Sequence, residues 1–104
     1  MSWIPVAAAA DIADGDYAQT EIDNALVAVF NIHGTFYAIE DVCTHDGGEL
    51  AGGAIDGDVV VCPRHGARFC LRTGAALTPP AYEPVRTFET RIRDGMVEVN
   101  SDPA

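Results

Sequence analysis

The sequence is poor in positive charge: its 104 residues contain six basic residues against sixteen acidic ones, a net charge of −10. Residues 1–58 hold eleven acidic residues and no lysine or arginine, whereas residues 59–104 hold five acidic residues and six arginines. This distribution argues against nucleic-acid binding, which requires a basic footprint. It favours either simple solubility or electrostatic attraction toward a basic partner protein.

Long apolar runs are also missing, so we expect no transmembrane helix and no membrane partner. Residues 1–5 lack a basic segment followed by an apolar stretch, and this predicts that no signal peptide is present. A soluble cytoplasmic protein is therefore expected. The length, with 48% hydrophobic residues, predicts one domain over residues 1–104 with a single core.

Cysteine is scarce, and the three cysteines are Cys43, Cys62 and Cys70. An odd number in a chain without a predicted signal peptide does not indicate a disulfide framework. If Cys43 and Cys62 bind a metal, Cys70 is left over, and we predict that it is a small buried hydrophobic residue. The Gly-x-Gly-x-x-Gly pattern of dinucleotide-binding folds is absent too, so the chain should not oxidise NAD(P)H itself.

Short apolar and alternating segments predict strands rather than helices. The expected strands are residues 17–22, 25–32, 35–39, 59–61, 85–92 and 96–99. Tight turns are expected at His33-Gly34 and Asp94-Gly95. Only the alanine-rich residues 7–13 are predicted to form a helical turn. Many short strands separated by Gly and Pro predict an all-β fold, a small antiparallel β-sandwich or barrel.

The most informative feature is a pair of motifs, Cys43-Thr44-His45 and Cys62-Pro63-Arg64-His65-Gly66, with sixteen residues between them. Each motif places one thiolate and one imidazole on a tight loop where a predicted strand stops. Two such loops facing each other can supply four ligands to a compact metal centre. Pro79-Pro80 marks a third stiff loop, which either covers this site or is only a rigid connection.

The residues alone leave other interpretations open. Two cysteines and two histidines could bind structural zinc, although zinc motifs usually pair like ligands, as Cys-x₂₋₄-Cys and His-x₃₋₅-His. Cys62 could be a catalytic nucleophile with His45 or His65 as its base, but the other pair would then be unexplained. If the four residues were only ordinary core cysteines and surface histidines, the two mirrored Cys–His pairs would have to have arisen by chance.

At these motifs the chain resembles Rieske proteins, in which two cysteines bind one iron of a two-iron cluster and two histidines bind the other. The resemblance to small bacterial Rieske ferredoxins continues from Gly66 to Arg86. It implies one [2Fe–2S] cluster, held by loops within about residues 41–75 that form a cluster-binding subdomain of the β fold. The implied ligands are Cys43 and Cys62 on the inner iron and His45 and His65 on the outer, more exposed iron.

Two departures from the family pattern bear on the reduction potential. Respiratory Rieske proteins join their two loops by a disulfide, but the matching positions here are Gly48 and Arg64. Ala67 stands where those proteins present a serine hydroxyl to the cluster. With fewer hydrogen bonds to the sulfur atoms, we predict a potential at the low end of the Rieske range of roughly −150 to +300 mV.

The resemblance implies an electron carrier rather than an enzyme: the ferredoxin of a multicomponent aromatic ring-hydroxylating dioxygenase. It would be a monomer that meets a flavin-dependent reductase and a terminal oxygenase transiently, with His45 and His65 as the electron port. Residues expected either to guide docking or to form only a solvated rim are Asp41, Asp46, Glu49, Arg64 and Arg68. Alternatives are the small Rieske-like subunit of an assimilatory nitrite reductase and a zinc-bound interaction module.

Overall fold

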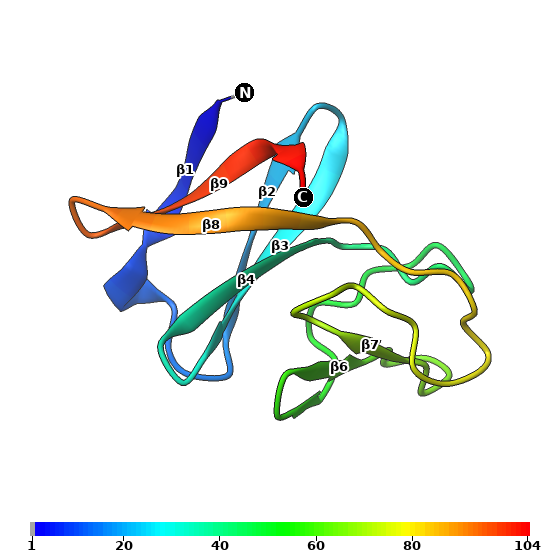
Figure 1. Ribbon diagram of the computed structural model, residues 1–104. Coiled ribbons are helices and arrows are strands. Elements are labelled where there is room, and N and C mark those ends of the chain that lie inside the picture. The colour runs from blue at the N-terminus through cyan, green and yellow to red at the C-terminus, as the bar shows by residue number, and fades with distance from the viewer. Residues whose placement is uncertain (1) are drawn as a thin grey trace.

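The computed structural model describes residues 2–104, which form an almost entirely antiparallel β structure (Figure 1). Its strands are β1 (Trp3–Ala8), β2 (Tyr17–Ile22), β3 (Ala25–Ile32), β4 (Thr35–Glu40), β5 (Ile55–Asp56), β6 (Val59–Val61), β7 (Arg68–Cys70), β8 (Thr87–Arg93) and β9 (Met96–Pro103). A 3₁₀ turn, η1 (Ala9–Asp11), follows β1, and residues 2–104 contain no helix with the length and apolar character to cross a bilayer. The predicted all-β class is confirmed.

The larger sheet has the strand order β1-β9-β8-β4-β3-β2, and β1 and β2 at its two ends contact each other, so the sheet curls toward a barrel. Two-residue turns close its hairpins at Asp23-Asn24, His33-Gly34 and Asp94-Gly95. Both residues of each turn have positive φ, the geometry whose twist matches that of antiparallel strands. Both turns predicted from the sequence are therefore present.

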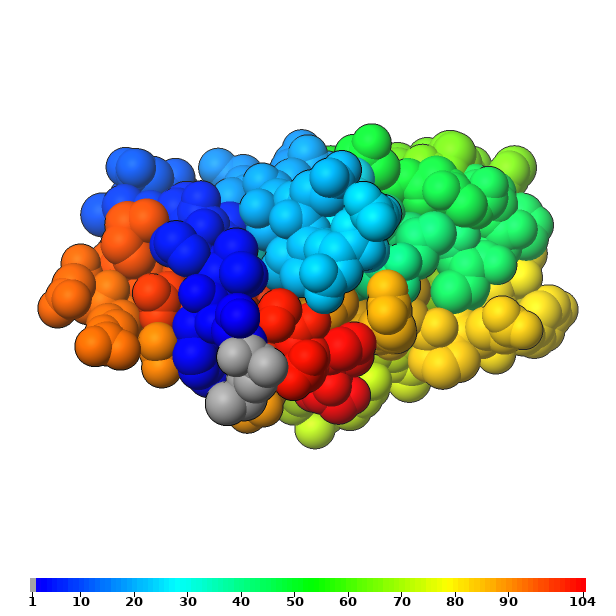
Figure 2. Space-filling model, turned by 90° about the horizontal axis from the view of Figure 1, so that it is seen from above, coloured from blue at the N-terminus to red at the C-terminus, as the bar shows by residue number. Residues whose placement is uncertain are grey.

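A second sheet, β5-β6-β7, lies with its loops at one end of the larger sheet, in green and yellow in Figure 1. The chain leaves the larger sheet after β4, forms this loop subdomain over residues 41–86, and returns as β8. The molecule is elongated, with extents of 40 × 27 × 18 Å along its principal axes. Figure 2 shows the green and yellow part at one end of it. The predicted subdomain is thus an insertion between two strands of the larger sheet.

Strand β3 joins the two parts because it is buried on both faces. Val27 and Val29 belong to the core of the curled sheet. Ala28 and Phe30 belong to a second core beneath the loops, which also contains Phe69. Since side chains alternate across a strand, one apolar run serves both cores. The expected single core is therefore wrong: the described residues contain two.

Some element boundaries also differ from the sequence prediction. The helical turn expected over residues 7–13 is present but shorter, as the 3₁₀ turn η1, because residues 7 and 8 belong to β1. Ala9 N donates to Gly95 O (2.8 Å) at the start of this turn. Strand β8 begins at Thr87 rather than at residue 85, because Val85 N donates to Gly74 O (2.9 Å) in the loop subdomain. Strands β1, β5 and β7 were not expected, and all three are held by pairing with partner strands.

Candidate metal centre

The two motifs form turns with the same backbone hydrogen bonds. Gly47 N donates to Cys43 O (2.7 Å), and Gly66 N donates to Cys62 O (3.1 Å). In both turns the cysteine N also donates to the carbonyl five residues further on, at 2.7 Å. Gly47 and Gly66 have φ values of +77° and +75°, which glycine adopts without strain. The sequence therefore builds two equivalent turns, each carrying one cysteine and one histidine.

The cysteines lie inside and the histidines lie at the surface. Cys43 and Cys62 are 0% and 2% exposed within the core beneath the loops, whereas His45 and His65 are exposed. The two sulfur atoms lie within 4.8 Å of each other, as do ring nitrogens of the two histidines. The imidazole rings are perpendicular, with centroids 5.2 Å apart. The fold thus brings the four predicted site residues together as an inner sulfur pair and an outer nitrogen pair.

This set of donors fits a metal centre. Burial raises the pKa of the Cys43 thiol and the neighbouring Cys62 adds to the shift, while N–H groups of His45 and Asp46 oppose it by donating to the sulfur. Two adjacent buried thiolates are unfavourable without a cation, and a bound metal ion supplies that positive charge. Two inner thiolates and two outer neutral imidazoles are the ligands of a [2Fe–2S] cluster with mixed ligation.

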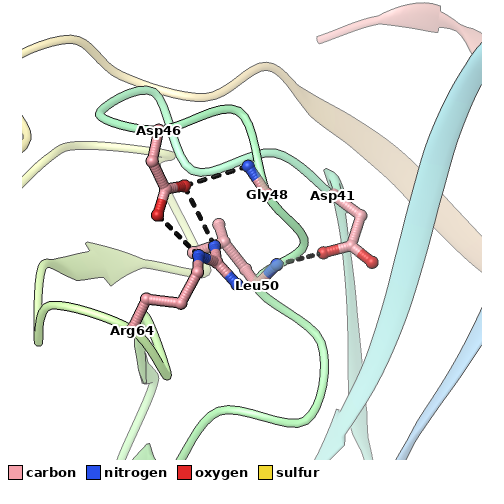
Figure 3. Close-up of polar contacts among 5 residues, drawn as sticks. All are labelled: Asp41, Asp46, Gly48, Leu50 and Arg64. Atoms are coloured by element: carbon pink, nitrogen blue, oxygen red, sulfur yellow. Dashed lines mark hydrogen bonds and ion pairs between the residues drawn. The ribbon is translucent and has the colours of Figure 1, made fainter.

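An ion pair joins the two turns beside these four residues (Figure 3). Arg64 Nε and Nη2 donate to Asp46 Oδ2 and Oδ1 at 2.5 and 3.1 Å, and Gly48 N also donates to Asp46 Oδ1 at 2.9 Å. The Arg64 guanidinium, helped by Gly48 N, holds the pKa of the Asp46 carboxyl well below its usual range. The sequence leaves open whether both residues guide docking or form a solvated rim, and the structure pairs their charges with each other.

The predicted docking role of Asp41 is wrong, because this residue is only 4% exposed. Its Oδ1 accepts hydrogen bonds from Leu50 N (2.7 Å) and Ala51 N (2.9 Å), and its Oδ2 accepts one from Gln19 Nε2 (2.7 Å). Figure 3 shows the carboxylate directed toward Leu50. Asp41 therefore fixes the loop that follows the first motif. Its exposed neighbour Glu49 also accepts from Gln19 Nε2 (2.7 Å).

The third loop lies beside the first motif, since Thr44 Oγ1 donates to Glu83 O (2.7 Å), three residues beyond Pro80. Arg68, the remaining docking candidate, pairs with Asp56 at 2.5 Å on the outside of the small sheet. Its side chain is 35% exposed and the aspartate side chain is 72% exposed. Both residues of this pair therefore stay accessible to a partner.

Cys70 is buried at 8% exposure, which confirms its prediction as a small buried residue. Sequence reasoning missed that it begins a third turn of the same kind, in which Gly74 N donates to Cys70 O (2.7 Å). Burial opposes ionisation of this thiol, but hydrogen bonds from Thr73 and from Arg72 N lower its pKa. The glycine four residues after each of the three cysteines is the signal that reveals the repeated turn.

A curled antiparallel sheet with an inserted loop subdomain, in which two Cys–His turns come together, defines the class of proteins that bind a metal cluster. A family model described as Rieske [2Fe-2S] domain matches residues 2–89. The chain is 39% identical over 101 residues to the biphenyl dioxygenase ferredoxin subunit of Pseudomonas sp. (strain KKS102), covering 94% of this chain and 93% of that protein. It is 38% identical over 98 residues to ferredoxin CarAc of Metapseudomonas resinovorans, covering 93% and 92%.

Comparison with solved structures also finds a similar ferredoxin. The ferredoxin-like chain in a complex of reduced oxygenase and oxidized ferredoxin in carbazole 1,9a-dioxygenase has a TM-score of 0.92 and 36% identity, covering 98% of this chain and 95% of that chain. A putative nitrite reductase small subunit has a TM-score of 0.81 at 21% identity, which shows the shared fold alone.

The chain belongs to the Rieske [2Fe–2S] family. It carries one Rieske-type [2Fe–2S] cluster, and it is a ferredoxin that transfers electrons rather than a catalytic enzyme. Family membership favours the iron–sulfur interpretation of the two motifs over the zinc site and the cysteine nucleophile.

Proposed function

We propose that this ferredoxin carries single electrons from a flavin-dependent NAD(P)H reductase to the terminal oxygenase of a multicomponent aromatic ring-hydroxylating dioxygenase. The observation that carries this proposal is its similarity, over nearly the whole chain, to ferredoxin subunits of biphenyl and 3-phenylpropionate/cinnamic acid dioxygenases. The solved relative in complex with an oxygenase supports the same kind of partner. The protein would act in the cytoplasm as a monomer, with all of residues 1–104 forming one Rieske domain.

The proposed ligands are Cys43 and Cys62 on the inner iron and His45 and His65 on the outer iron. Their placement supports this assignment, because the sulfur atoms lie in the core and the imidazoles lie at the surface. When bound, the cluster supplies one-electron chemistry at a potential set by its ligands and surroundings. The two imidazoles, as the outermost ligands, give a partner protein its shortest electron path.

The surroundings support a potential at the low end of the family range. Ala67 is fully buried after the second motif and has no hydroxyl to donate to a sulfur atom. Docking is proposed to be brief, as is typical of small redox interfaces. Glu49 and Arg68 are the charged candidates for orienting the partner, since Asp41 is buried and Asp46 is paired across the two turns.

Metal and sulfide analysis of anaerobically purified protein, followed by EPR after dithionite reduction, tests the ligand assignment. Cys43→Ser and Cys62→Ser should lose the cluster and its low-average-g EPR signal. Cys70→Ser is the matched control, because Cys70 is also buried in a turn of the same kind and should leave iron, sulfide and EPR signal unchanged. A native signal in either of the first two variants would contradict the assignment.

Reconstitution tests the electron-transfer role. A biphenyl- or carbazole-type oxygenase and its reductase should hydroxylate substrate only when this chain is added with its cluster. The apoprotein is the control for nonspecific stimulation. A fully loaded protein that is reduced but supports no turnover with any such oxygenase, while supporting nitrite reduction in the corresponding system, would favour the nitrite reductase alternative.

A further inference from the structure

The pair Asp46–Arg64 differs from the other ion pairs of residues 2–104 in where it lies. Asp46 directly follows one proposed ligand, His45, and Arg64 directly precedes another, His65. One carboxylate oxygen of Asp46 lies within 4.8 Å of both cysteine sulfur atoms, and one lies within 4.8 Å of a ring nitrogen of each histidine. The pair therefore stands beside all four proposed ligands.

The contact has a geometry that suits a cross-link between two loops. The guanidinium donates to both carboxylate oxygens, and bidentate arginine–carboxylate pairs are among the stronger charge-assisted hydrogen bonds. The side chains of Arg64 and Asp46 are 36% and 21% exposed, less than the 66% and 40% of the pair Arg72–Asp58. Water screens the Arg64–Asp46 pair less, so its contribution should exceed that of an ordinary surface pair.

Gly48 makes room for this contact. A Cβ atom at Gly48 would lie 2.5 Å from Arg64 Cζ, 2.7 Å from Nη2 and 2.8 Å from Nε, closer than real Cβ contacts. The guanidinium thus lies directly against the backbone of the first turn, and Gly48 N donates to the same carboxylate that receives it. Asp46, Gly48 and Arg64 form one interlocked unit (Figure 3).

We infer that the Asp46–Arg64 pair is a positioning clasp that holds the two ligand turns together and balances the charge beside the cluster. This inference rests on the proposed ligand assignment. The clasp has two separable consequences. As a cross-link, it slows release of the cluster. As a pair of opposite charges, it cancels most of the electrostatic effect that each member alone exerts on adding an electron.

Four variants separate these consequences. Asp46→Asn removes a negative charge and should raise the reduction potential, whereas Arg64→Gln removes a positive charge and should lower it. The double variant should return the potential toward the wild-type value. Arg64→Lys keeps the positive charge but loses the bidentate contact with Asp46, so its reduction potential should stay close to that of the wild type.

Release of the cluster is timed by the loss of visible absorbance in the presence of an iron chelator. Arg64→Gln and Arg64→Lys should both release the cluster faster, by about threefold or more for a well-formed ion pair. The double variant should be no faster than the faster single variant, because the clasp is already lost. Arg72→Gln and Asp58→Asn, which break an ion pair away from the ligands, are matched controls and should change neither quantity.

The outcomes distinguish this inference from the proposed function. Potentials that shift in the same direction in Asp46→Asn and Arg64→Gln, or release rates equal to the wild type in both Arg64 variants, would overturn the clasp. The wild-type protein would still have its cluster and its electron-transfer activity in that case. A wild-type protein with no iron–sulfur cluster would instead overturn the ligand assignment on which the clasp rests.

Discussion

Replacing Asp41 should destabilise the protein without affecting its docking. In Asp41→Ala the N–H groups of Leu50 and Ala51 lose their acceptor. A buried N–H without a partner costs about 1–3 kcal/mol. Because Leu50 is fully buried and Ala51 only partly so, we expect a total of about 2–4 kcal/mol. For a domain of this size that loss lowers the melting temperature by at least about 8 °C.

The assay is thermal unfolding at a fixed scan rate, followed by far-UV circular dichroism and by visible absorbance of the cluster. Asp41→Asn keeps an oxygen that accepts from the two N–H groups, but its amide nitrogen would face Gln19 Nε2, which is also a donor. We therefore expect this variant to be less stable than the wild type by about 1 kcal/mol. Glu49→Gln is the matched control, since Glu49 accepts from the same Gln19 nitrogen but is exposed. We expect it to change stability by no more than about 0.5 kcal/mol.

Equal melting temperatures for Asp41→Ala and Glu49→Gln would refute this reasoning. So would an Asp41→Asn protein of wild-type stability whose coupling to the reductase shows an altered salt dependence, because that result would restore the docking role. The two carboxylates share the partner Gln19, so the comparison shows the combined effect of the burial of Asp41 and of its two backbone hydrogen bonds.

Three further predictions concern the loop subdomain. Gly48→Ala should displace the Arg64 guanidinium and accelerate release of the cluster into a chelator, and an unchanged rate would contradict the close contact. Phe69→Ala removes a fully buried ring and should cost about 3–5 kcal/mol in chemical denaturation, whereas a cost below that of Glu49→Gln would show that the ring is not part of a packed core. Removal of the cluster should speed amide hydrogen exchange in β6 and β7 more than in β8 and β9, and equal acceleration would argue against two separate cores.

The hairpins were predictable because their signals are local. In both β3–β4 and β8–β9, residues that favour strands flank a turn ending in glycine, all within one short segment. Strand β1 could not be predicted in this way, because Trp3 pairs with Asn100, almost the whole chain away. Strands β5 and β7 have two and three residues, too few for a period to be recognised. Their extended conformation follows from pairing with β6.

The parts of the candidate site that depend on the spacing of residues in the sequence were predictable. The parts that depend on tertiary contacts were not. The two motifs give the four proposed ligands, Cys43, His45, Cys62 and His65. Nothing in the sequence around Asp41 distinguishes it from the other acidic residues near the first motif. Its burial depends on Gln19 of β2 and on two backbone N–H groups that reach it only in the folded chain.

The uneven charge of the sequence has a different meaning once the chain is folded. Four of the six arginines, all of which lie within residues 59–104, pair with acidic residues from residues 1–58: Asp46–Arg64, Asp56–Arg68, Asp58–Arg72 and Glu40–Arg86. Much of the apparent charge separation is therefore cancelled within the molecule. A basic partner responds to acidic groups that no arginine neutralises, and such attraction weakens as ionic strength rises. Glu49, whose partner Gln19 is neutral, keeps its charge beside the cluster turns and is a better docking candidate than Asp46, whose charge Arg64 balances.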